Sequence, residues 1–297
     1  MKVSLVTATY NRADLLWKCY KSLKNQSVNN FEWIIVDDGS NDHTKEVIAR
    51  IEEDSKNFIV KAYTKINGGK HTAINFSLEH LSGEVTCILD SDDTLIARAV
   101  ENIIEKWNIF YNDPQIGCIS FLKGYTELVP MAGEITQKEI RSNHIKYRIN
   151  KGIKGDFCEV IKTSILKETP FPLIADEKFM SEGWLWTKVS LNYDTVYIGK
   201  VIYIADYLED GLTLQGRALR LKSPEAGRIN SIMQMNKKIR IRYRIKQAIL
   251  YNVYSLTKEI TFFELIHDNP YKIITCLTFP LGFILSKKWN SAAKKEV

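Results

Sequence analysis

Three carboxylates crowd into residues 87–93, which read C-I-L-D-S-D-D. Asp90 and Asp92 lie two positions apart after an apolar stretch, so in an extended chain their side chains point to the same side. Acids this close raise each other's pKa, so a positive partner is expected nearby. A hard cation such as Mg²⁺ prefers oxygen ligands and is often held by one or two carboxylates together with substrate phosphates. The spacing therefore indicates a site for a divalent cation and phosphates, with a solvated strand-to-helix turn as the alternative interpretation.

A helix is expected soon after these acids. Apolar residues recur every four positions at Leu95, Ala99, Ile103 and Trp107, which is typical of a helix face that becomes buried. The first backbone N–H groups of such a helix need an acceptor. We therefore expect Asp93 to be the N-cap of this helix.

Strand-like and helix-like segments alternate over roughly the first 120 residues. Strands are predicted at residues 3–9, 31–36, 58–64 and 85–89, with helices between them. Asn11 and Asp14 are the predicted caps of the first helix. This order predicts an α/β fold with a mainly parallel sheet flanked by helices on both faces. Ligands of such sheets bind beyond the carboxyl ends of the strands, where polar clusters occur at residues 9–11, 37–38 and 90–93.

Composition is that of an ordinary globular protein, with 45% hydrophobic and 26% charged residues. The net charge of +6 favours an anionic partner, such as phosphates, nucleic acid or a lipid surface. Five scattered cysteines, never in C-x-x-C spacing, argue against a zinc knuckle or disulfide framework and favour a reducing compartment. The apolar start of the chain is too short for a signal peptide and is predicted to be the first strand, so a cytoplasmic location is expected.

Four motifs at predicted strand ends occur in a fixed order. They are V-T-A-T-Y-N-R at 6–12, I-V-D-D-G-S at 35–40, N-G-G at 67–69 with Asn75 following, and L-D-S-D-D at 89–93. Together they resemble the family 2 glycosyltransferases of the GT-A fold, which use nucleotide-diphosphate sugars. The likeness covers about 110 residues, and a weaker match, S-E-G-W at 181–184, extends it toward residue 210.

The resemblance implies a domain division. A Rossmann-like GT-A domain is expected over residues 1–212, with a nucleotide-binding half at 1–115 and an acceptor half at 116–212. Residues 213–297 are expected to form a basic, mainly helical C-terminal extension.

The resemblance also implies the nucleotide site. Asp92 would bind the divalent cation, Mn²⁺ or Mg²⁺, while Asp90 would contact the ribose or the metal. Asp38 would accept a hydrogen bond from the uracil base; an Asx-type turn that supports Gly39 is the alternative, and Asp37 and Asp38 can divide these tasks. Thr7 and Thr9 would line the uridine slot, or simply fill the strand. The complete predicted set is Thr7, Thr9, Asn11, Asp38, Gly69, Lys70, Asn75, Asp90 and Ser91.

Transfer to a hydroxyl group needs a base, and Glu182 is the predicted one. Ser181 has the character of an N-cap, which places Glu182 in the first turn of a helix whose dipole keeps it ionised. The alternative is that Glu182 only satisfies the helix start. Members of the family usually carry an acidic pair here, whereas Gly183 follows Glu182, so Glu177 is a second candidate base.

On the acceptor side, Asp156 and Trp184 are tentative contacts. Aromatic faces suit the C–H surfaces of sugars, although core packing is expected for at least one of Trp184 and Trp186. The Q-x-x-R-W motif of the family's processive synthases has no match at Gln215, which favours single transfers.

The C-terminal extension gathers basic residues between 237 and 246, and long helices are expected from 217 to about 260. Two interpretations are open: docking to the inner face of the cytoplasmic membrane, or a solvated helix face. The apolar run at 273–285 is shorter than the ~20 residues of a membrane span and contains Pro280. Nucleic-acid binding is not expected, because no recognition motif accompanies the charge.

The resemblance thus implies an inverting glycosyltransferase that moves a sugar from a nucleotide-diphosphate donor, UDP by preference, to a hydroxyl of a glycan or lipid-linked glycan. One alternative is a sugar-nucleotide pyrophosphorylase, but residues 9–14 lack the glycine-rich loop that such an enzyme needs. Another is a non-catalytic protein of the same fold that binds carbohydrate or membrane.

Overall fold

A computed structural model describes residues 1–132, 139–205 and 212–293. Within these residues the chain forms a ten-stranded sheet whose order is β3-β2-β1-β4-β9-β6-β10-β5, with β7 beside β6 and β8 beside β10. The strands are β1 (Val3–Thr9), β2 (Phe31–Asp37), β3 (Ile59–Thr64), β4 (Val85–Ile88), β5 (Thr94–Leu95), β6 (Ile116–Thr126), β7 (Val129–Pro130), β8 (Glu139–Ser142), β9 (Phe157–Lys162) and β10 (Asp194–Ile204).

The first four long strands are parallel, as the alternating sequence predicts. β1 lies between β2 and β4, and β3 follows beside β2. Each of these strands lies within a residue or two of its predicted bounds. Their carboxyl ends meet at one edge, so the polar clusters that follow β1, β2 and β4 are brought together there.

Beyond β4 the sheet becomes mixed. β9 is antiparallel to both β4 and β6, whereas β10 is parallel to β6. Parallel neighbours need a long crossover connection, usually a helix, whereas antiparallel neighbours do not. The regular strand–helix alternation stops in this part of the sequence, and β9 is antiparallel to its neighbours. The mainly parallel arrangement therefore holds for the predicted nucleotide half, and the acceptor half adds antiparallel pairs.

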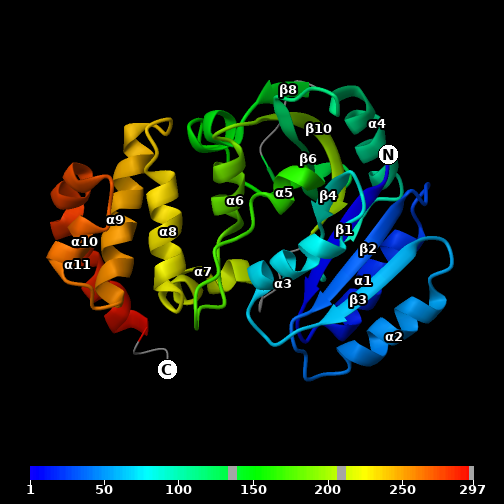
Figure 1. The fold of residues 1–297 in the computed structure, drawn as a ribbon, viewed down its shortest axis with the longest axis horizontal. Coiled ribbons are helices and arrows are strands. Elements are labelled where there is room, and N and C mark those ends of the chain that lie inside the picture. The colour runs from blue at the N-terminus through cyan, green and yellow to red at the C-terminus, as the bar shows by residue number, and fades with distance from the viewer. Residues whose placement is uncertain (133–138, 206–211, 294–297) are drawn as a thin grey trace.

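Helices cover both faces of the sheet (Figure 1). α1 (Ala13–Lys24), α2 (Thr44–Asp54) and α4 (Ala99–Phe110) pack on one face with Leu5 and Trp33. α3 (Lys70–Ser77), α5 (Thr163–Lys167) and α6 (Glu182–Val189) pack on the other face with Val6 and Ile34. A short 3₁₀ turn, Leu78–His80, and a π-helical turn, His144–Ile149, complete this part. The alternation of side chains along each strand thus feeds two separate cores.

Two predicted caps are wrong. α1 begins at Ala13 after Arg12, and Asn11 instead has a φ of 50° and accepts a hydrogen bond from the backbone N–H of Asn41. α4 begins at Ala99, because the short strand β5 intervenes after the acids. Asp93 is therefore buried beside the sheet and caps no helix.

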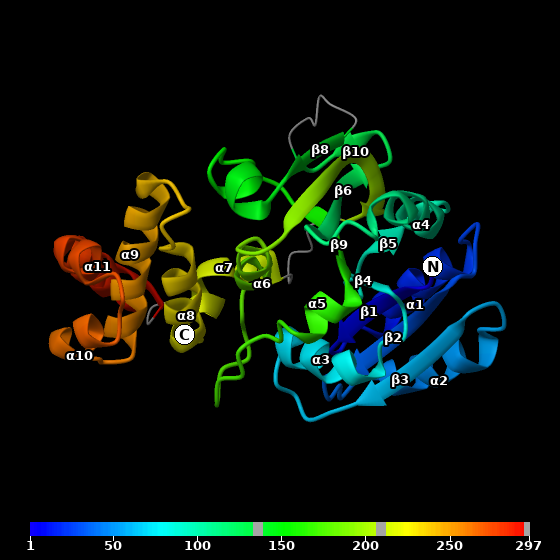
Figure 2. The ribbon, with the colours of Figure 1, turned by 45° about the horizontal axis from the view of Figure 1, so that its top comes forward.

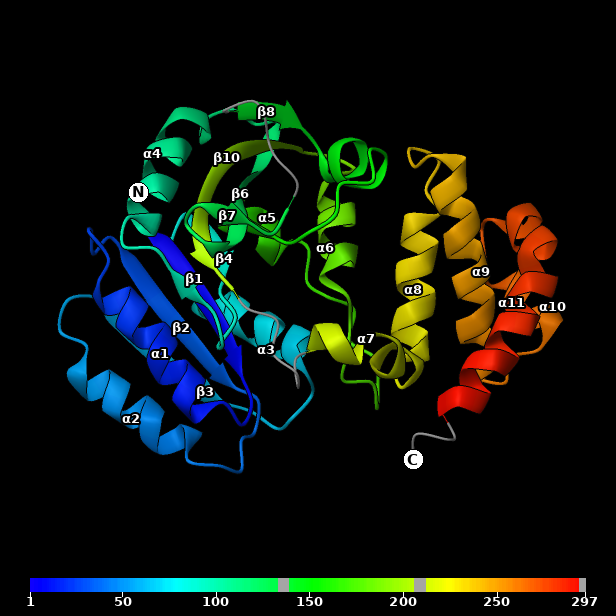
Figure 3. The same ribbon diagram turned by 180° about the vertical axis from the view of Figure 1, so that it is seen from behind.

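The C-terminal extension is helical, as predicted. Its helices are α7 (Leu212–Leu221), α8 (Pro224–Gln234), α9 (Ile241–Thr257), α10 (Phe262–His267) and α11 (Lys272–Ala293). α8 packs against α6, α9 against α8 and α11 against α9, so the helices are layered outward from the sheet (Figures 1 and 3). The predicted boundary at 212/213 adjoins residues 206–211, which lie outside the described residues, and it stays a prediction. In the described part of the chain no helix has both the length and the apolar character needed to cross a membrane.

Candidate active site

Asp90 is the centre of a cluster of charges at the carboxyl end of β4. Its carboxylate forms ion pairs with Lys70 and with the Nζ of Lys123, the latter at 3.4 Å. Lys123 also lies 3.8 Å from the carboxylate of Asp93. The backbone N–H of Asp90 donates to the Tyr203 hydroxyl at 2.9 Å, which fixes this position against β10. The positive partner that the acids need is therefore supplied in part by two lysines.

The acids of this cluster differ in how readily they ionise. Burial would raise the pKa of Asp90, but Lys70 and Lys123 outweigh it and hold the pKa well below its ordinary value. Burial, and then the charge of Asp90, raises the pKa of Asp93 to about 7. The same two causes raise the pKa of Asp92. Negative charge at Asp92 and Asp93 is thus incompletely compensated, which is the condition that a further cation would relieve.

Lys70 connects this cluster to the predicted base. Besides Asp90, its Nζ contacts the Oε1 of Glu182 at 2.5 Å. The pKa of Lys70 would fall through burial, but Asp90 and Glu182 raise it above its ordinary value. Ser181 is the N-cap of α6 and accepts from the backbone N–H of Gly183, so Glu182 begins the helix as predicted. The starts of α3 and α6 are therefore held together by one lysine between two carboxylates.

Glu177, the second candidate base, is engaged elsewhere. Its two carboxylate oxygens accept hydrogen bonds from the backbone N–H groups of Glu225 and Ala226, at 2.7 and 2.8 Å. These groups belong to the first turn of α8, so Glu177 acts as a cap supplied from another part of the chain. Of the two candidate bases, Glu182 is therefore the one connected to the acid cluster, through Lys70.

The two acids that follow β2 divide their tasks. Asp37 accepts from the backbone N–H and the hydroxyl of Ser40, at 3.0 and 2.5 Å, which forms the turn. Asp38 accepts from the backbone N–H groups of Gly68 and Gly69, at 3.0 and 2.6 Å. In this structure Asp38 therefore holds the glycine loop, and a contact with a uracil base would have to be made beside these bonds.

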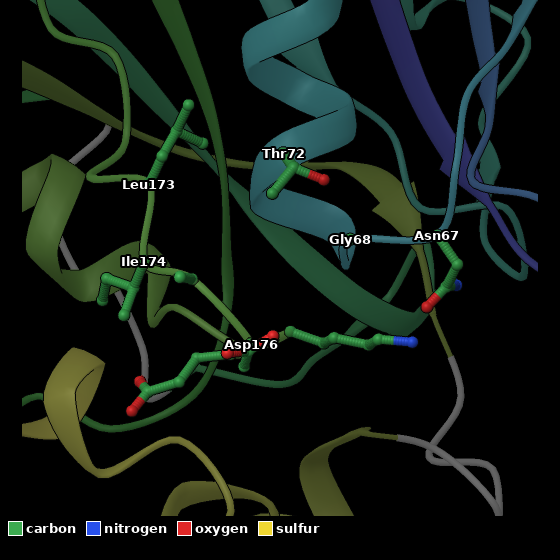
Figure 4. Close-up of a pocket in the computed structure, with 9 residues that line it drawn as sticks. Asn67, Gly68, Thr72, Leu173, Ile174 and Asp176 are labelled. Atoms are coloured by element: carbon green, nitrogen blue, oxygen red, sulfur yellow. The ribbon is translucent and has the colours of Figure 1, made fainter.

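A cavity of about 360 Å³ lies next to the glycine loop. Figure 4 shows it between Asn67 and Gly68, the first turn of α3, and the segment at 173–178. Gly69 has a φ of +91°, and a Cβ at this position would overlap the backbone carbonyl of Lys178. Only glycine fits such a close approach, so the loop and the covering segment are packed backbone to backbone.

Three predicted contact residues make contacts with other residues of the protein. Thr7 is fully buried, and its hydroxyl accepts from the indole N–H of Trp33 at 2.8 Å. The Asn75 side chain both donates to and accepts from the backbone of Phe171, at 2.8 Å each. Trp184 is 8% exposed and packs against Phe171 with ring centroids 6.2 Å apart. These contacts tie the three side chains to neighbouring residues, and their predicted contacts with uridine or acceptor stay predictions.

Four other predicted residues are placed at or near the site. Thr9 ends β1, is buried, and its hydroxyl has no hydrogen-bond partner among the residues that the structure describes. Ser91 is buried between Asp90 and Asp92. Asn11 lies exposed in the loop after β1, and Asp156 is exposed directly before β9. Among these four residues, Thr9 is the one whose buried hydroxyl stays available for a further hydrogen bond.

Sequence reasoning missed Lys123 as a member of the cluster. It lies on β6, is half-buried, and its Nζ lies 4.0 Å from the ring centroid of Tyr203. Burial would lower the pKa of Lys123, but Asp90 and Asp93 raise it above the ordinary value. The only signal in the sequence is a lysine that interrupts the otherwise apolar run at 116–122.

Glu159 on β9 is a half-buried acid that the sequence also did not indicate. Arg148 approaches it at 3.8 Å, yet burial raises the pKa of Glu159 to about 7. The charge of Glu182 contributes to this rise, so Glu159 belongs to the same electrostatic environment as the predicted base.

A divalent cation fits this site only together with a ligand. Across 1–132, 139–205 and 212–293, no three His, Cys, Asp or Glu side chains form a group that could hold a metal by themselves. The half-buried, incompletely compensated carboxylate of Asp92 is nevertheless a suitable oxygen ligand. Mg²⁺ and similar ions are commonly held in this way, by one or two carboxylates with the phosphates of the substrate.

The fold and the site define a class of protein that binds nucleotide diphosphates. Ligands of a Rossmann-like sheet bind beyond the carboxyl ends of the strands. Carboxylates at that edge can share a divalent cation with the diphosphate. The model of glycosyl transferase family 2 matches residues 4–162. The chain belongs to this family.

Two relatives illustrate the match. The GalNAc(5)-diNAcBac-PP-undecaprenol beta-1,3-glucosyltransferase of Campylobacter jejuni is 30% identical over 218 residues, which cover 72% of this chain and 67% of the relative. The poly(ribitol-phosphate) beta-glucosyltransferase of Bacillus spizizenii is 27% identical and is covered over only 32% of its length. Glycosyltransferase activity is thus what the family and its named members support.

Solved structures with the same fold include the S. aureus protein TarS, residues 1–349, in complex with UDP-GlcNAc. It has a TM-score of 0.61 and 18% identity, with 95% of this chain and 79% of that chain covered. The mannosyltransferase PcManGT from Pyrobaculum calidifontis, in complex with GDP-Man and Mn²⁺, has a TM-score of 0.58 and 15% identity, covering 99% and 83%. At these identities the likeness establishes the GT-A fold.

Proposed function

We propose that this protein is an inverting glycosyltransferase that moves a sugar from a nucleotide-diphosphate donor, UDP by preference, to a hydroxyl of a glycan or lipid-linked glycan. The observation that carries the proposal is the joining of Asp90 and Glu182 through Lys70. This contact places the candidate base next to the acids that would hold the diphosphate end of the donor. A binding protein has no need of a carboxylate at that position.

The preference for UDP is supported by the neighbours. Two of the relatives are glucosyltransferases, and the TarS structure holds UDP-GlcNAc. In this chain the nucleoside would lie by the end of β1 and the loop at 67–69, near the unsatisfied hydroxyl of Thr9. Asn11, Gly69 and Ser91 are the other predicted contacts in that region.

In the proposed reaction Glu182 accepts the proton of the acceptor hydroxyl. The oxygen then forms a bond to the anomeric carbon on the face opposite the diphosphate, the bond to the diphosphate oxygen breaks with its electron pair, and the configuration inverts. Proton transfer of this kind contributes typically about 10²- to 10⁴-fold. Glu182 must release its ion pair with Lys70 to do this, while Lys70 keeps its ion pair with Asp90 and its positive charge near the diphosphate.

Asp92, with Asp90 beside it, would hold a divalent cation, Mn²⁺ or Mg²⁺. Bound there, such a cation supplies Lewis-acid stabilisation of the leaving diphosphate. Lys70 and Lys123 add fixed positive charge from the protein side, since both pKa values are raised above the ordinary range and both side chains stay protonated.

The acceptor is proposed to approach from the side of α6 and β9, near Asp156. A lipid-linked glycan fits, because the Campylobacter relative is named for an undecaprenol-linked substrate. Such acceptors would place the enzyme in the cytoplasm, at the inner face of the membrane, in the synthesis of a surface polysaccharide. Membrane docking by the basic residues at 237–246 was one of the two interpretations of that stretch, and it stays a proposal.

The proposal is tested by nucleotide release from UDP-glucose, UDP-GlcNAc and GDP-mannose, each with Mn²⁺ and with EDTA. We expect one UDP-sugar to be consumed with Mn²⁺ only, and Asp92→Asn to abolish this turnover. Asp54→Asn is the matched control, because Asp54 lies on α2 and pairs with Lys24, outside the cluster. If nucleotides bind but no sugar is released or transferred, the non-catalytic alternative is correct.

A further inference from the structure

The outward face of α11 is apolar. Ile273, Leu277 and Leu281 repeat every four residues and are 79%, 76% and 57% exposed. Ile284 continues the row at 65%. A helix of a water-soluble domain normally turns such a row toward the core.

Aromatic side chains extend this surface onto α10. Phe283 of α11 lies near Phe279, whose ring centroid is 4.7 Å from that of Phe262. Phe262 in turn contacts Phe263, which is 83% exposed. We call the surface formed by Phe262, Phe263, Ile273, Leu277, Leu281, Phe283 and Ile284 the α10–α11 apolar face.

The inward face of α11 carries small polar residues beside apolar Ile274 and Phe279, which pack against a core of Met235, Ala248, Tyr251 and Leu265. Thr275, Thr278 and Ser286 are buried, at 0%, 6% and 4% exposure. Asn252 of α9 donates to the carbonyl of Thr275 and the hydroxyl of Thr278, at 3.1 Å each. Gly282 also packs so closely on Asn252 that a Cβ there would overlap it. Small residues and side-chain hydrogen bonds between helices are typical of helix packing in lipid, where apolar groups gain nothing by turning inward.

Positive charge lies at both ends of the apolar face. Lys272 begins α11, Lys287 and Lys288 follow the apolar row, and all three are exposed. The sequence from 272 to 293 contains no Asp or Glu. The Nζ of Lys287 lies 4.5 Å from the centroid of the Phe283 ring, so this positive charge is held against the apolar face by a cation–π contact. This arrangement is complementary to a surface with an apolar interior and anionic head groups.

A second copy of the chain fits this face less well. If two α11 helices paired antiparallel, Lys272 of each would lie opposite Lys287 and Lys288 of the other. If they paired in parallel, each lysine would meet its own equivalent. Either arrangement brings like charges together without an acid on the face to compensate them.

We propose that the α10–α11 apolar face lies in the plane of an anionic lipid surface, with α11 parallel to it. The helix is the outermost layer of the molecule, on the side away from the sheet (Figures 2 and 3). The basic stretch at 237–246 is a weaker candidate, because Lys238 and Arg244 donate to the carbonyls of Leu191 and Met235. The inference does not rest on the proposed reaction and stands or falls separately from it.

The test is sedimentation of the full chain with vesicles of phosphatidylcholine, with and without phosphatidylglycerol. We expect binding to the anionic vesicles, reduced by salt. Leu277→Ser/Leu281→Ser should weaken this binding at least about tenfold, since each exposed leucine loses its transfer into lipid. Leu128→Ser is the control: Leu128 is 90% exposed between β6 and β7, and its loss should leave binding unchanged.

Nucleotide release from a soluble sugar donor, measured without vesicles, should be the same for all these variants. The proposal is overturned if the wild-type chain binds neither kind of vesicle, or if the double variant binds as well as the wild type. It is also overturned if light scattering finds a dimer that the double variant converts to a monomer, because the face is then an interface between copies.

Discussion

The sheet region, which carries the site, and the two helices α9 and α11 differ in where they place polar side chains. In the sheet, apolar side chains are buried, and a buried carboxylate such as Glu32 is surrounded by donors from Lys2, Ser4 and Ser82. In α9 and α11, small polar side chains are buried and the apolar row faces outward. The first arrangement is that of a protein in water, and the second is the one expected if the outer surface of α11 meets lipid, as proposed above.

Within the sheet region, the largest expected effect is a loss of sugar transfer, and it distinguishes Glu182, the predicted base, from Glu177, the second candidate. Glu182→Gln should lower the rate of sugar transfer by about 10²- to 10⁴-fold, because it removes the proton acceptor beside Lys70. Steady-state transfer to a glycan acceptor, monitored by nucleotide release, measures it.

Glu177→Gln is the matched control. It weakens the cap of α8 and should lower the free energy of unfolding by about 1 kcal/mol, while transfer stays close to the wild-type rate. If Glu177→Gln lost transfer and Glu182→Gln kept it, the assignment of the base would be reversed.

Replacing a leucine by alanine in each region tests whether the sheet region and the α10–α11 apolar face differ in burial. Leu16 of α1 is fully buried, and Leu16→Ala should lower the free energy of unfolding by about 2–5 kcal/mol. Leu277→Ala on the apolar face should change it by less than about 0.5 kcal/mol in buffer without lipid. Urea denaturation of both variants compares them directly. A loss at Leu277 as large as that at Leu16 would mean that this face is covered in the free protein.

The buried carboxylate of Glu32 gives the stability of the sheet region a dependence on pH. Burial would raise its pKa, but hydrogen bonds from Ser4 and Ser82, together with Lys2, lower it from 4.5 to about 2. Because the folded pKa is depressed, the stabilisation is present above pH ~4.5 and is lost as the pH falls toward 2; a difference of this size corresponds to about 3 kcal/mol.

Glu32→Gln should therefore be less stable than the wild type at pH 7, and the gap should close between pH ~4.5 and 2. Urea unfolding at a series of pH values measures the gap. A gap that does not change with pH would show that the charge of Glu32 contributes nothing.

The sequence predicted the parallel half well, because its information there is local. Strand and helix periods appear within ten residues, and the motifs at 6–12, 35–40 and 89–93 sit where strands end. The roles of Asp38 and Glu177 could not be predicted, because both depend on backbone N–H groups about 30 to 50 positions away. Lys123 was missed for the same reason: its partners Asp90 and Asp93 lie on another strand's end.

The mixed half and the outer helices were harder to predict for two further reasons. Antiparallel pairing of β9 with β4 and β6 joins segments far apart in the chain, which periodicity does not reveal. In α11 the sequence shows an apolar run but not which side faces outward. That depends on Asn252, whose side chain holds the polar face of α11 inward.

Thermal unfolding with UDP, GDP, dTDP and CMP, each with Mn²⁺ and again with EDTA, tests the central claim most directly. A nucleotide at 100 times its Kd should add about 2.7 kcal/mol of stability. We predict that UDP alone does so, that EDTA abolishes the gain, and that Asp92→Asn loses it. If no nucleotide stabilised the protein, or if the gain survived both EDTA and Asp92→Asn, the acid cluster would not be a metal-dependent nucleotide-diphosphate site.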